Sequence, residues 1–416
     1  MKKRLFLLCT FLGLMGQINA DVIEGQCGDG VIYQWHTETG KLVISGHGPM
    51  DDYNSIDERP WHGPSPSLFK SIVIEHGVTH IGDRAFWGFY GFDHLTLPMS
   101  VTSIGDEAFY ACNYLTTLVM SPSVVSIGDH AFASCSGLDC ELVLSNCLET
   151  IGEGAFSGCK KLKGDLLIPN SVKTIGNNAF AGCVGFTGAL YLGTSLETIG
   201  EHAFSGGLNF TGNLAIPETV TSIGRSAFDG CKYLIGEVVV PKGVTMIEDC
   251  VFRDCSGITG ITLLGEVTHI RNSAFSRCSS LIDFFCHAIT PPDATEYFVF
   301  DKIPLKTVYV PAESVDLYKA ALVWKDFEIL PIGGSGMEST LNRNSVCISL
   351  QNGKLMVKTE NGHLKSVALV SVNGVEVLSD KSVSSFVELD MSSVPSGVYL
   401  VSVVTNTGEC CRKVVW

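Results

Sequence analysis

The sequence predicts a solenoid, in which short coils of chain stack on one another, because one phrase recurs at a nearly constant interval. The phrase reads IGDRAF from Ile81 and returns in variants up to IRNSAF from Ile270. Its nine copies begin 23 or 24 residues apart. A repeat of that length cannot bury its apolar face alone, but stacked repeats bury a continuous core. Solenoids act by presenting a long surface, so a binding role is expected before a catalytic one.

Aligned on its phenylalanine, the repeat has the form of a leucine-rich repeat, L-x-x-L-x-L-P-x-S-V-x-x-I-G-x-x-A-F-x-x-C. An apolar residue always lies 12 positions before the Phe, as Ile168 lies before Phe180. We therefore expect two short extended segments in each coil, with alternate side chains buried. In this coil the side chains expected to point inward are Leu166, Ile168, Val172 and Ile175.

The turns of each coil follow from two further positions. Gly176 should permit a turn that a bulkier residue would not accept, and Ala179-Phe180 should begin a short helical turn. Glu248 and Arg271 replace the turn glycine in the last two coils, so these coils should bend differently. The predicted fold class is a leucine-rich repeat solenoid, mainly β with short helical turns, over residues 71–286.

The chain contains sixteen cysteines, and seven of them form one column of the repeat. Each falls three residues after the repeat Phe: Cys112, Cys135, Cys159, Cys183, Cys231, Cys255 and Cys278. The periodicity favours packing, because a buried free cysteine behaves as a small hydrophobic residue. Disulfides between neighbouring coils remain an alternative, since a coil rise of about 4.8 Å lies within the Cα separation that a disulfide tolerates.

Residues 1–20 have the composition of a signal peptide, with a basic start, an apolar stretch over residues 5–15 and Ala20 before the expected cleavage site. The formal net charge of -15 opposes binding to nucleic acid. No later apolar run reaches the roughly 18 residues needed to cross a bilayer. We expect an exported protein without a transmembrane segment, secreted or held at the outer cell surface after cleavage near Ala20.

The repeat resembles that of the BspA-like leucine-rich repeat family of bacterial surface proteins, since V-x-x-I-G-x-x-A-F-x-x-C recurs through the array. Residues 21–70 resemble the N-terminal cap of that family. Physically, Trp35 and Trp61 can seal the open end of the core, because an uncovered terminal coil would expose an edge. The family resemblance implies adhesion to host matrix proteins, host cells or other bacteria.

Residues 287–332 should form the C-terminal cap of the array. Pro291-Pro292 breaks the period, and residues 307–311 read as one more strand. Residues 314–324 have helical spacing, with Ser314 as the expected N-cap. The apolar side of this helix would carry Val315, Tyr318, Ala321 and Leu322.

After a flexible linker over residues 333–340, residues 341–416 predict a β-sandwich, because alternating strands are separated by Asn-Gly turns at residues 352–353, 361–362 and 373–374. Its final segments, SVALV from Ser366, PSGVYLV from Pro395 and RKVVW from Arg412, resemble the C-terminal sorting domain of the type IX secretion system. That resemblance implies export across the outer membrane. An ordinary accessory β-domain is the alternative.

The sequence offers no set of residues for catalysis, for a cofactor or for a metal. His76 and His80 are four residues apart, but HGVTH lacks the Glu of a zinc-protease helix and lies in a strand-and-turn context. No phosphate-binding glycine loop, G-x-S-x-G elbow or calcium loop is present. We therefore do not expect an enzyme.

One outward column of the first extended segments is mostly apolar, and a column two residues earlier carries acidic residues. We expect these columns to bind a partner, since exposed apolar stripes with polar rims mark interaction surfaces. The candidate residues are Val143, Leu167, Tyr191, Val239 and Phe285, with Glu141, Asp165 and Glu237 beside them. β-Branched residues that merely favour strand pairing are the simpler alternative.

The function predicted from these observations is recognition by a non-catalytic secreted or cell-surface protein. A protein ligand, such as host matrix or another bacterial surface, is the expected partner. A glycan-binding protein for nutrient capture and an architectural surface spacer are the alternatives. The glycan alternative would favour exposed aromatic residues, and only Tyr191 and Phe285 occur in the apolar column.

Overall fold

The computed structural model describes residues 21–206, 209–332, 346–351, 354–359, 363–371, 376–381, 384–395, 398–405 and 409–415. The signal segment 1–20, the linker 333–340 and the three predicted Asn-Gly turns lie outside the described residues. The chain divides after Leu330 into two compact units. Each unit is described by itself.

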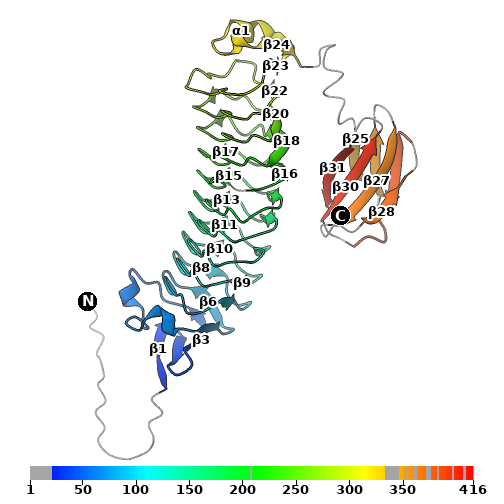
Figure 1. Cartoon of the computed structure of the whole chain (residues 1–416). Helices are drawn as coiled ribbons and strands as arrows, with labels where there is room; N and C mark the ends of the chain where they lie inside the picture. Colours follow the sequence, from blue (N-terminus) through cyan, green and yellow to red (C-terminus); the bar gives the residue numbers. More distant parts are fainter. Residues whose placement is uncertain are drawn as a thin grey trace, which may run out of the picture. The chain divides into compact units, whose positions relative to one another are not determined.

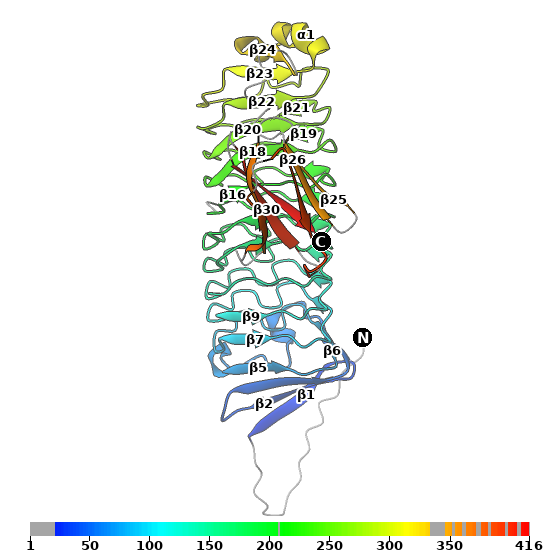
Figure 2. The same ribbon diagram turned by 90° about the vertical axis from the view of Figure 1, so that its right-hand side faces the viewer.

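The first unit is a β-solenoid whose coils contribute short parallel strands to two ladders (Figure 1). It begins with a sheet in the order β1-β2-β3-β5, made of β1 (Val22–Gly28), β2 (Val31–His36), β3 (Lys41–Gly46) and β5 (Ser71–Ile74). Figure 2 shows β5, β7 and β9 stacked one above another. The first strands continue as β7 (His94–Thr96), β9 (Thr117–Val119), β12 (Leu166–Leu167), β14 (Leu190–Tyr191), β16 (Gly212–Asn213), β18 (Leu234–Val240), β20 (Ile258–Leu263), β22 (Asp283–Cys286), β23 (Thr307–Val310) and β24 (Glu328–Pro331).

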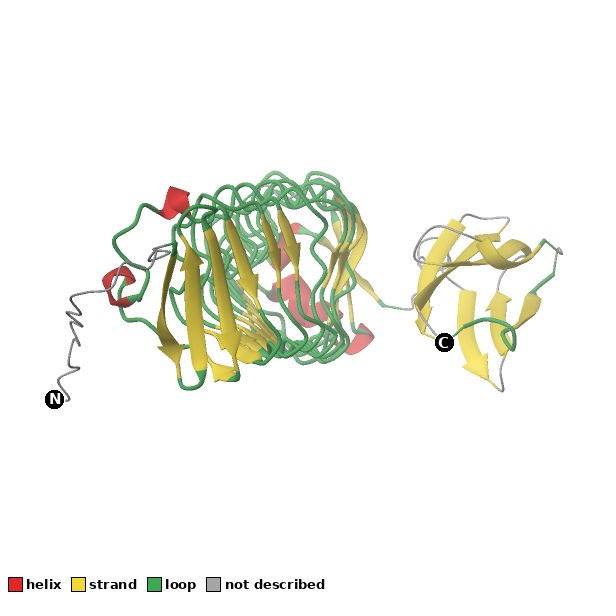
Figure 3. Cartoon of the chain, turned by 90° about the horizontal axis from the view of Figure 1, so that it is seen from below, coloured by secondary structure: helices red, strands yellow, loops and turns green. Residues whose placement is uncertain are grey.

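The second strands of the coils form a sheet of eight and then, after an interruption, a sheet of two. The sheet of eight holds β4 (Gly48–Pro49), β6 (Val78–Ile81), β8 (Ser103–Ile104), β10 (Ser126–Ile127), β11 (Thr150–Ile151), β13 (Thr174–Ile175), β15 (Thr198–Ile199) and β17 (Ser222–Ile223). The sheet of two pairs β19 (Met246–Ile247) with β21 (His269–Ile270). Helical segments are few (Figure 3): η1 (Ile56–Glu58), η2 (Pro66–Leu68), η3 (Ala312–Ser314), α1 (Val315–Ala320) and η4 (Trp324–Asp326).

The core of the solenoid is a column of stacked aromatic rings, one from each coil. Phe156 and Phe180 are typical members, with ring centroids 5.4 Å apart and planes 5° apart. The inward positions predicted for this coil, Leu166, Ile168 and Val172, are also buried. A short helical turn was predicted at Ala179-Phe180, but the structure has a hydrogen-bonded turn there without a helix. The alignment on Phe therefore identified the core correctly and assigned its turn wrongly.

The cysteine column packs beside this aromatic column as free thiols. Each of the seven cysteines lies in the core and directs its thiol at a main-chain carbonyl of the preceding coil. Cys183, for example, donates from Sγ to the carbonyl oxygen of Phe156 at 3.0 Å. Packing, the favoured interpretation of the column, is confirmed, and neighbouring thiols are not joined among the described cysteines.

The repeat glycine is required by close approach rather than by its backbone conformation. A Cβ on Gly176 would lie 2.6 Å from the main-chain nitrogen of Glu153, on the coil below. The left-handed conformation falls instead two residues later, at positions such as Asn178 with φ of 56°. A bulkier residue is therefore excluded there, as predicted, but by contact with the coil below rather than by a left-handed backbone. Where Glu248 replaces the glycine, the second ladder is interrupted between β17 and β19, whereas β19 still pairs with β21 where Arg271 replaces it.

Both ends of the core are closed by aromatic residues, as the sequence predicted for the N-terminal end. Trp61 stacks on Phe86 with centroids 5.6 Å apart, and Trp35 packs against Phe69. At the other end Phe300 continues the ring column beyond Phe275, past the point where the sequence period stops.

The C-terminal helix differs from its prediction. It covers only Val315–Ala320, and Ser314 makes no side-chain cap hydrogen bond. The side chain of Ser314 is instead buried, and its Oγ has no hydrogen-bond partner among the residues that the structure describes. Tyr318 is buried as predicted, whereas Leu322 lies beyond the helix and is exposed. The end of the solenoid is sealed by Tyr318 together with Trp324, whose rings meet edge to face.

The second unit consists of two small antiparallel sheets around one core, which confirms the predicted β-sandwich. One sheet has the order β25-β26-β29, with β25 (Val346–Gln351), β26 (Lys354–Thr359) and β29 (Phe386–Asp390). The other has the order β28-β27-β30-β31, with β28 (Glu376–Asp380), β27 (Leu364–Ser371), β30 (Val398–Thr405) and β31 (Glu409–Val415). Buried residues of both sheets, including Val357 and Val401, form a single cluster.

Candidate binding surfaces

The outward column of the first strands has the register that the sequence predicted. Leu167 pairs with Tyr191 across β12 and β14, and Val239 pairs with Thr262 across β18 and β20. Leu167 and Tyr191 therefore stand one above the other on neighbouring coils, and the coil of Ala215 lies between Tyr191 and Val239. We call Val119, Val143, Leu167, Tyr191 and Val239 the first-strand stripe.

Most of the first-strand stripe is exposed to solvent. The exposed fraction is 52% for Val119, 73% for Val143, 52% for Leu167 and 39% for Val239, and Tyr191 is half-buried. Phe285, predicted to be an outward member, is only 9% exposed. Its ring stacks on that of Tyr309 at 4.7 Å, because β22 and β23 pair these two residues directly. The stripe therefore ends before the last coils.

The three acidic candidates, Glu141, Asp165 and Glu237, are all exposed beside the stripe. Two of them also serve the fold. Asp165 accepts the main-chain N–H of Ala189 through Oδ1 at 2.7 Å, and Glu237 accepts the hydroxyl of Thr262. Each retains a second carboxylate oxygen, so an acidic flank remains available to a partner.

His80 belongs to a polar cluster that sequence spacing did not indicate. Its two ring nitrogens contact Ser103 Oγ at 2.8 Å and Asp52 Oδ1 at 3.1 Å. Potential ligand atoms of Asp52, His80 and Asp83 all lie within 4.8 Å of one another. Asp52 Oδ1 also accepts the N–H of Asp83, and Asp83 Oδ1 accepts the N–H of Asp106. The polar atoms of this cluster are therefore already engaged in hydrogen bonds within the fold.

The pKa of Asp52 reflects these contacts. Burial by itself raises the pKa of the Asp52 carboxyl group, but hydrogen bonds from Asp83 and His80 and the charge of His80 outweigh burial, so the pKa lies below its usual value. The contacts of Asp52 with Asp83 and His80 are therefore sufficient to account for its low pKa. His76, the other histidine of the HGVTH segment, is exposed.

A second candidate surface is a groove of about 640 Å³ along the second strands, which the sequence did not predict. We call it the second-strand groove. One row of its lining consists of hydroxyl residues, one per coil: Ser103, Ser126, Thr150, Thr174 and Thr198. A neighbouring row consists of Asp106, Asp129, Glu153 and Asn177. The acidic row could have been found from the residue after each Ile-Gly, a position whose residue type varies along the repeat.

The acidic row of the groove is built into the coil-to-coil hydrogen bonding. Asp106 Oδ1 accepts the main-chain N–H of Asp129 at 2.7 Å, and Asp129 Oδ1 accepts that of Glu153 at 2.7 Å. Asn177 repeats the contact with Glu201 at 2.8 Å. These bonds hold each carboxylate at the groove while leaving the other oxygen of Asp106 and Asp129 without a partner among the described residues.

In the described parts of the chain, the thiols with strongly raised pKa values lie in the core, where burial disfavours the thiolate; burial raises the pKa of Cys183 to about 12. A buried protonated thiol is a poor nucleophile. Over the same residues, no helix has both the length and the apolar composition needed to cross a bilayer.

Comparison with known families accounts for both units. A model of the BspA type leucine-rich repeat region matches residues 65–187 and 197–323, in six copies. A model of the secretion system C-terminal sorting domain matches residues 351–416, which points to secretion and surface attachment. None of the curated proteins compared matches the chain.

Three solved structures are similar over most of the chain. A leucine-rich repeat protein from Eubacterium ventriosum is 19% identical, with 75% of this chain and 94% of that chain covered and a TM-score of 0.40. A leucine rich cell surface protein from Faecalibacterium prausnitzii is 20% identical, with coverages of 76% and 97% and a TM-score of 0.40. A leucine-rich repeat protein from Bacteroides ovatus is 20% identical, with coverages of 73% and 98% and a TM-score of 0.31.

The family match covers more than half of the chain, and it falls on the coils whose aromatic column and two ladders are described above. The sorting-domain match falls on the separate β-sandwich. The chain belongs to the BspA type leucine-rich repeat family of surface proteins, and it carries a secretion-system sorting domain at its C-terminal end.

Proposed function

We propose that this chain is a non-catalytic adhesion protein that binds a protein ligand, on a host matrix or another bacterium, through the first-strand stripe. The observation that carries the proposal is the exposure of four apolar side chains, Val119, Val143, Leu167 and Val239, in one outward column. Contiguous exposed apolar surface with a polar rim favours an interaction site. The acidic flank of Glu141, Asp165 and Glu237 would select a ligand with basic residues around an apolar centre.

A binding measurement with three substitutions tests the proposal. The whole secreted chain is immobilised, and purified host matrix proteins and surface proteins of co-resident bacteria are passed over it. The variant Val143→Ser, Leu167→Ser, Val239→Ser should lose at least about tenfold in affinity for any ligand found, since buried apolar area is removed from the interface. Circular dichroism should show an intact fold, because all three side chains are exposed.

The matched control removes similar apolar groups from other surfaces. The variant Met99→Ser, Tyr233→Ser, Ile282→Ser changes three exposed residues outside the first-strand stripe. It should bind as the unmodified chain does. An equal loss in both variants, or no loss in the stripe variant, would rule out the stripe as the binding surface.

Export by the C-terminal unit is the second part of the proposal. Cleavage of the signal peptide near Ala20 would be followed by outer-membrane passage directed by residues 341–416. A chain ending at Ile332 should accumulate inside the cell envelope, as measured by immunoblots of envelope and surface fractions. Surface display of that truncated chain would contradict a sorting role and favour an accessory β-domain.

Two other functions use the same architecture. A glycan receptor would be favoured by tight, saturable binding on a glycan array that the stripe variant abolishes. A surface spacer would be favoured if the solenoid bound none of the matrix, bacterial or glycan probes. Apolar exposure of the stripe supports the protein ligand over both.

A further inference from the structure

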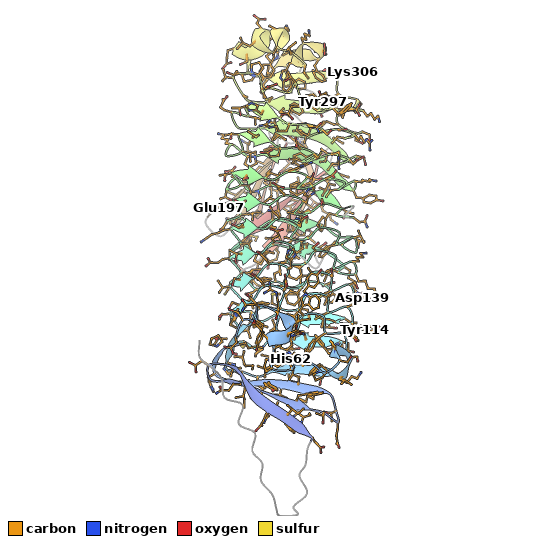
Figure 4. All side chains as sticks on the ribbon, turned by 90° about the vertical axis from the view of Figure 1, so that its left-hand side faces the viewer. His62, Tyr114, Asp139, Glu197, Tyr297 and Lys306 are labelled. Carbon is orange, nitrogen blue, oxygen red and sulfur yellow. The ribbon has the colours of Figure 1, made fainter. Side chains whose placement is uncertain are left out.

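The second-strand groove is chemically different from the first-strand stripe, and the proposed adhesion function does not use it. Figure 4 places Glu197, the neighbour of the groove residue Thr198, on the opposite edge from Tyr114 and Asp139. The groove runs along β8, β10, β11, β13 and β15, from His80 to Gly200. Its volume of about 640 Å³ lies within the range of ligand sites.

The charge of the groove has one sign. Asp106, Asp129 and Glu153 line it, and its lining includes no lysine or arginine. Lys173, which precedes the groove residue Thr174, pairs with Glu149 at 3.7 Å. At the position after each Ile-Gly, the first basic residue is Arg225, which lies beyond the end of the groove. Its Nε is 3.9 Å from Asp249 Oδ2. The groove is therefore complementary to a cationic ligand.

The carboxylates of this row repel one another. They repeat at the coil rise of about 4.8 Å, and like charges directly across neighbouring strands are unfavourable. Asp83 continues the row below the groove. Burial raises the pKa of Asp83 above its usual value, and the charges of Asp52 and Asp106 act in the same direction, against the lowering effect of the Asp106 N–H. A bound cation would relieve this repulsion.

The hydroxyl row supplies a second, independent feature. Ser103 Oγ is occupied by His80. The hydroxyls of Ser126, Thr150, Thr174 and Thr198 make no hydrogen bond with any residue that the structure describes. Unpaired hydroxyls at regular spacing can each donate and accept, which suits the alternating N–H and C=O groups of an extended chain.

We propose that the second-strand groove binds an extended arginine- or lysine-rich peptide segment, whose cationic side chains pair with Asp106, Asp129 and Glu153. The hydroxyl row receives the main chain of this segment. An extended peptide that rises about 3.1–3.4 Å per residue covers two coils, about 9.6 Å, in three residues. A cation at every third position therefore meets every second position of the row, so one register pairs with Asp106 and Glu153 and the other with Asp129.

The test uses the whole secreted chain and a fluorescent nonapeptide with arginine at every third position and serine elsewhere. Fluorescence anisotropy should show saturable binding that 1 M NaCl abolishes, because the screening length falls to about 3 Å. The same peptide with glutamine in place of arginine should not bind. Absence of binding by the arginine peptide would overturn the proposal.

The variant Asp106→Asn, Asp129→Asn, Glu153→Gln removes the charges and keeps the oxygens with which residues 106 and 129 accept main-chain N–H groups. It should weaken binding at least about tenfold. The matched control, Glu141→Gln, Asp165→Asn, Glu237→Gln, removes the same charge from the flank of the first-strand stripe and should leave the affinity within about twofold. Equal weakening in both would show attraction by net charge alone and would overturn the groove.

A substitution that adds rather than removes charge gives an independent check. Thr150→Lys places a cation in the middle of the groove and should abolish peptide binding, whereas Thr245→Lys, on an exposed site outside the groove, should not. A neutral hexasaccharide that binds the groove while the arginine peptide does not would overturn the peptide as occupant. Failure of the first-strand stripe to bind adhesion ligands would leave this result unaffected, since the two surfaces are measured with different probes.

Discussion

The ring of Trp61 lies on that of Phe86 with the two planes only 6° apart, so a residue of the N-terminal cap supplies the first member of the aromatic column. The indole Nε1 of Trp61 also donates to the carbonyl oxygen of Ala85 at 3.0 Å. The cap is thus a coil of the solenoid with a different sequence. Its removal would expose the ring of Phe86 to water.

Replacement of Trp61 by alanine should destabilise the solenoid by about 3–5 kcal/mol, because a buried ring is lost and a cavity remains. Urea unfolding followed by circular dichroism measures the change. Trp87→Ala is the control, since Trp87 is half-buried and stacks on Tyr110 outside the column. A loss for Trp87→Ala as large as that for Trp61→Ala would contradict the sealing role.

Replacement of Gly176 by alanine should cost about 1–3 kcal/mol or more, since the new Cβ would overlap main-chain atoms of the coil below. The neighbouring change Asn177→Ala removes only an exposed hydrogen bond to Glu201 and should cost about 1 kcal/mol. Thermal unfolding compares the two variants. If Gly176→Ala proved as stable as the unmodified chain, the close-approach explanation would fail.

Replacement of Ser314 by alanine should leave stability unchanged or raise it slightly, because its buried Oγ has no partner to lose. Ser171→Ala is the opposite case, since Ser171 Oγ donates to the carbonyl oxygen of Leu148 at 2.6 Å. That change should cost about 1 kcal/mol. A clear loss of stability in Ser314→Ala, measured by urea unfolding, would restore the N-cap interpretation.

The solenoid should become less stable as pH rises above about 9. Burial raises the pKa of Cys183 to about 12, with main-chain hydrogen bonds acting in the other direction, whereas a thiol in the unfolded chain ionises near pH 9. Between these values the unfolded state binds fewer protons, so the free energy of unfolding falls with pH by about 1.4 kcal/mol per unit for this one thiol. Below pH 9 the two states bind the same proton, and this contribution to the pH dependence disappears.

The Cys183→Ala variant isolates this effect. Its free energy of unfolding should fall less steeply above pH 9 than that of the unmodified chain, and the difference in slope should be about 1.4 kcal/mol per pH unit. Urea titrations at several alkaline pH values measure the slopes. Parallel slopes would show that Cys183 does not carry the alkaline loss.

The periodic sequence was sufficient for the register of the coils, because one residue from each coil fills the same place in the core. Counting 12 residues back from Phe180 placed Ile168 inside and Leu167 outside, and both positions are correct. Features that depend on contact between coils were not predictable in the same way. Gly176 is required because the coil below approaches it closely. Phe285 is buried because it pairs with Tyr309, and the sequence period did not reveal that pairing.

The second-strand groove was missed for a related reason. Asp106, Asp129 and Glu153 follow the repeat glycine at a position that varies from coil to coil, and the repeat pattern alone indicated no role for it. In the structure, main-chain N–H groups of successive coils fix the carboxylates of Asp106 and Asp129 in one row, and Glu153 follows on the next coil. The charge of each residue was visible in the sequence, but its alignment with the hydroxyl row depends on the stacking geometry.

The interruption between β17 and β19 has a mechanical consequence for a protein held at a surface. At this junction the second ladder is absent, as the first ladder is between β5 and β7, between β9 and β12 and between β14 and β16. The first ladder, through β16, β18 and β20, and the ring contact of Phe228 with Phe252 still cross this point. Under tension along the axis, coils should part first at junctions that lack one ladder, and the junction between Ile223 and Met246 is the one that lacks the second.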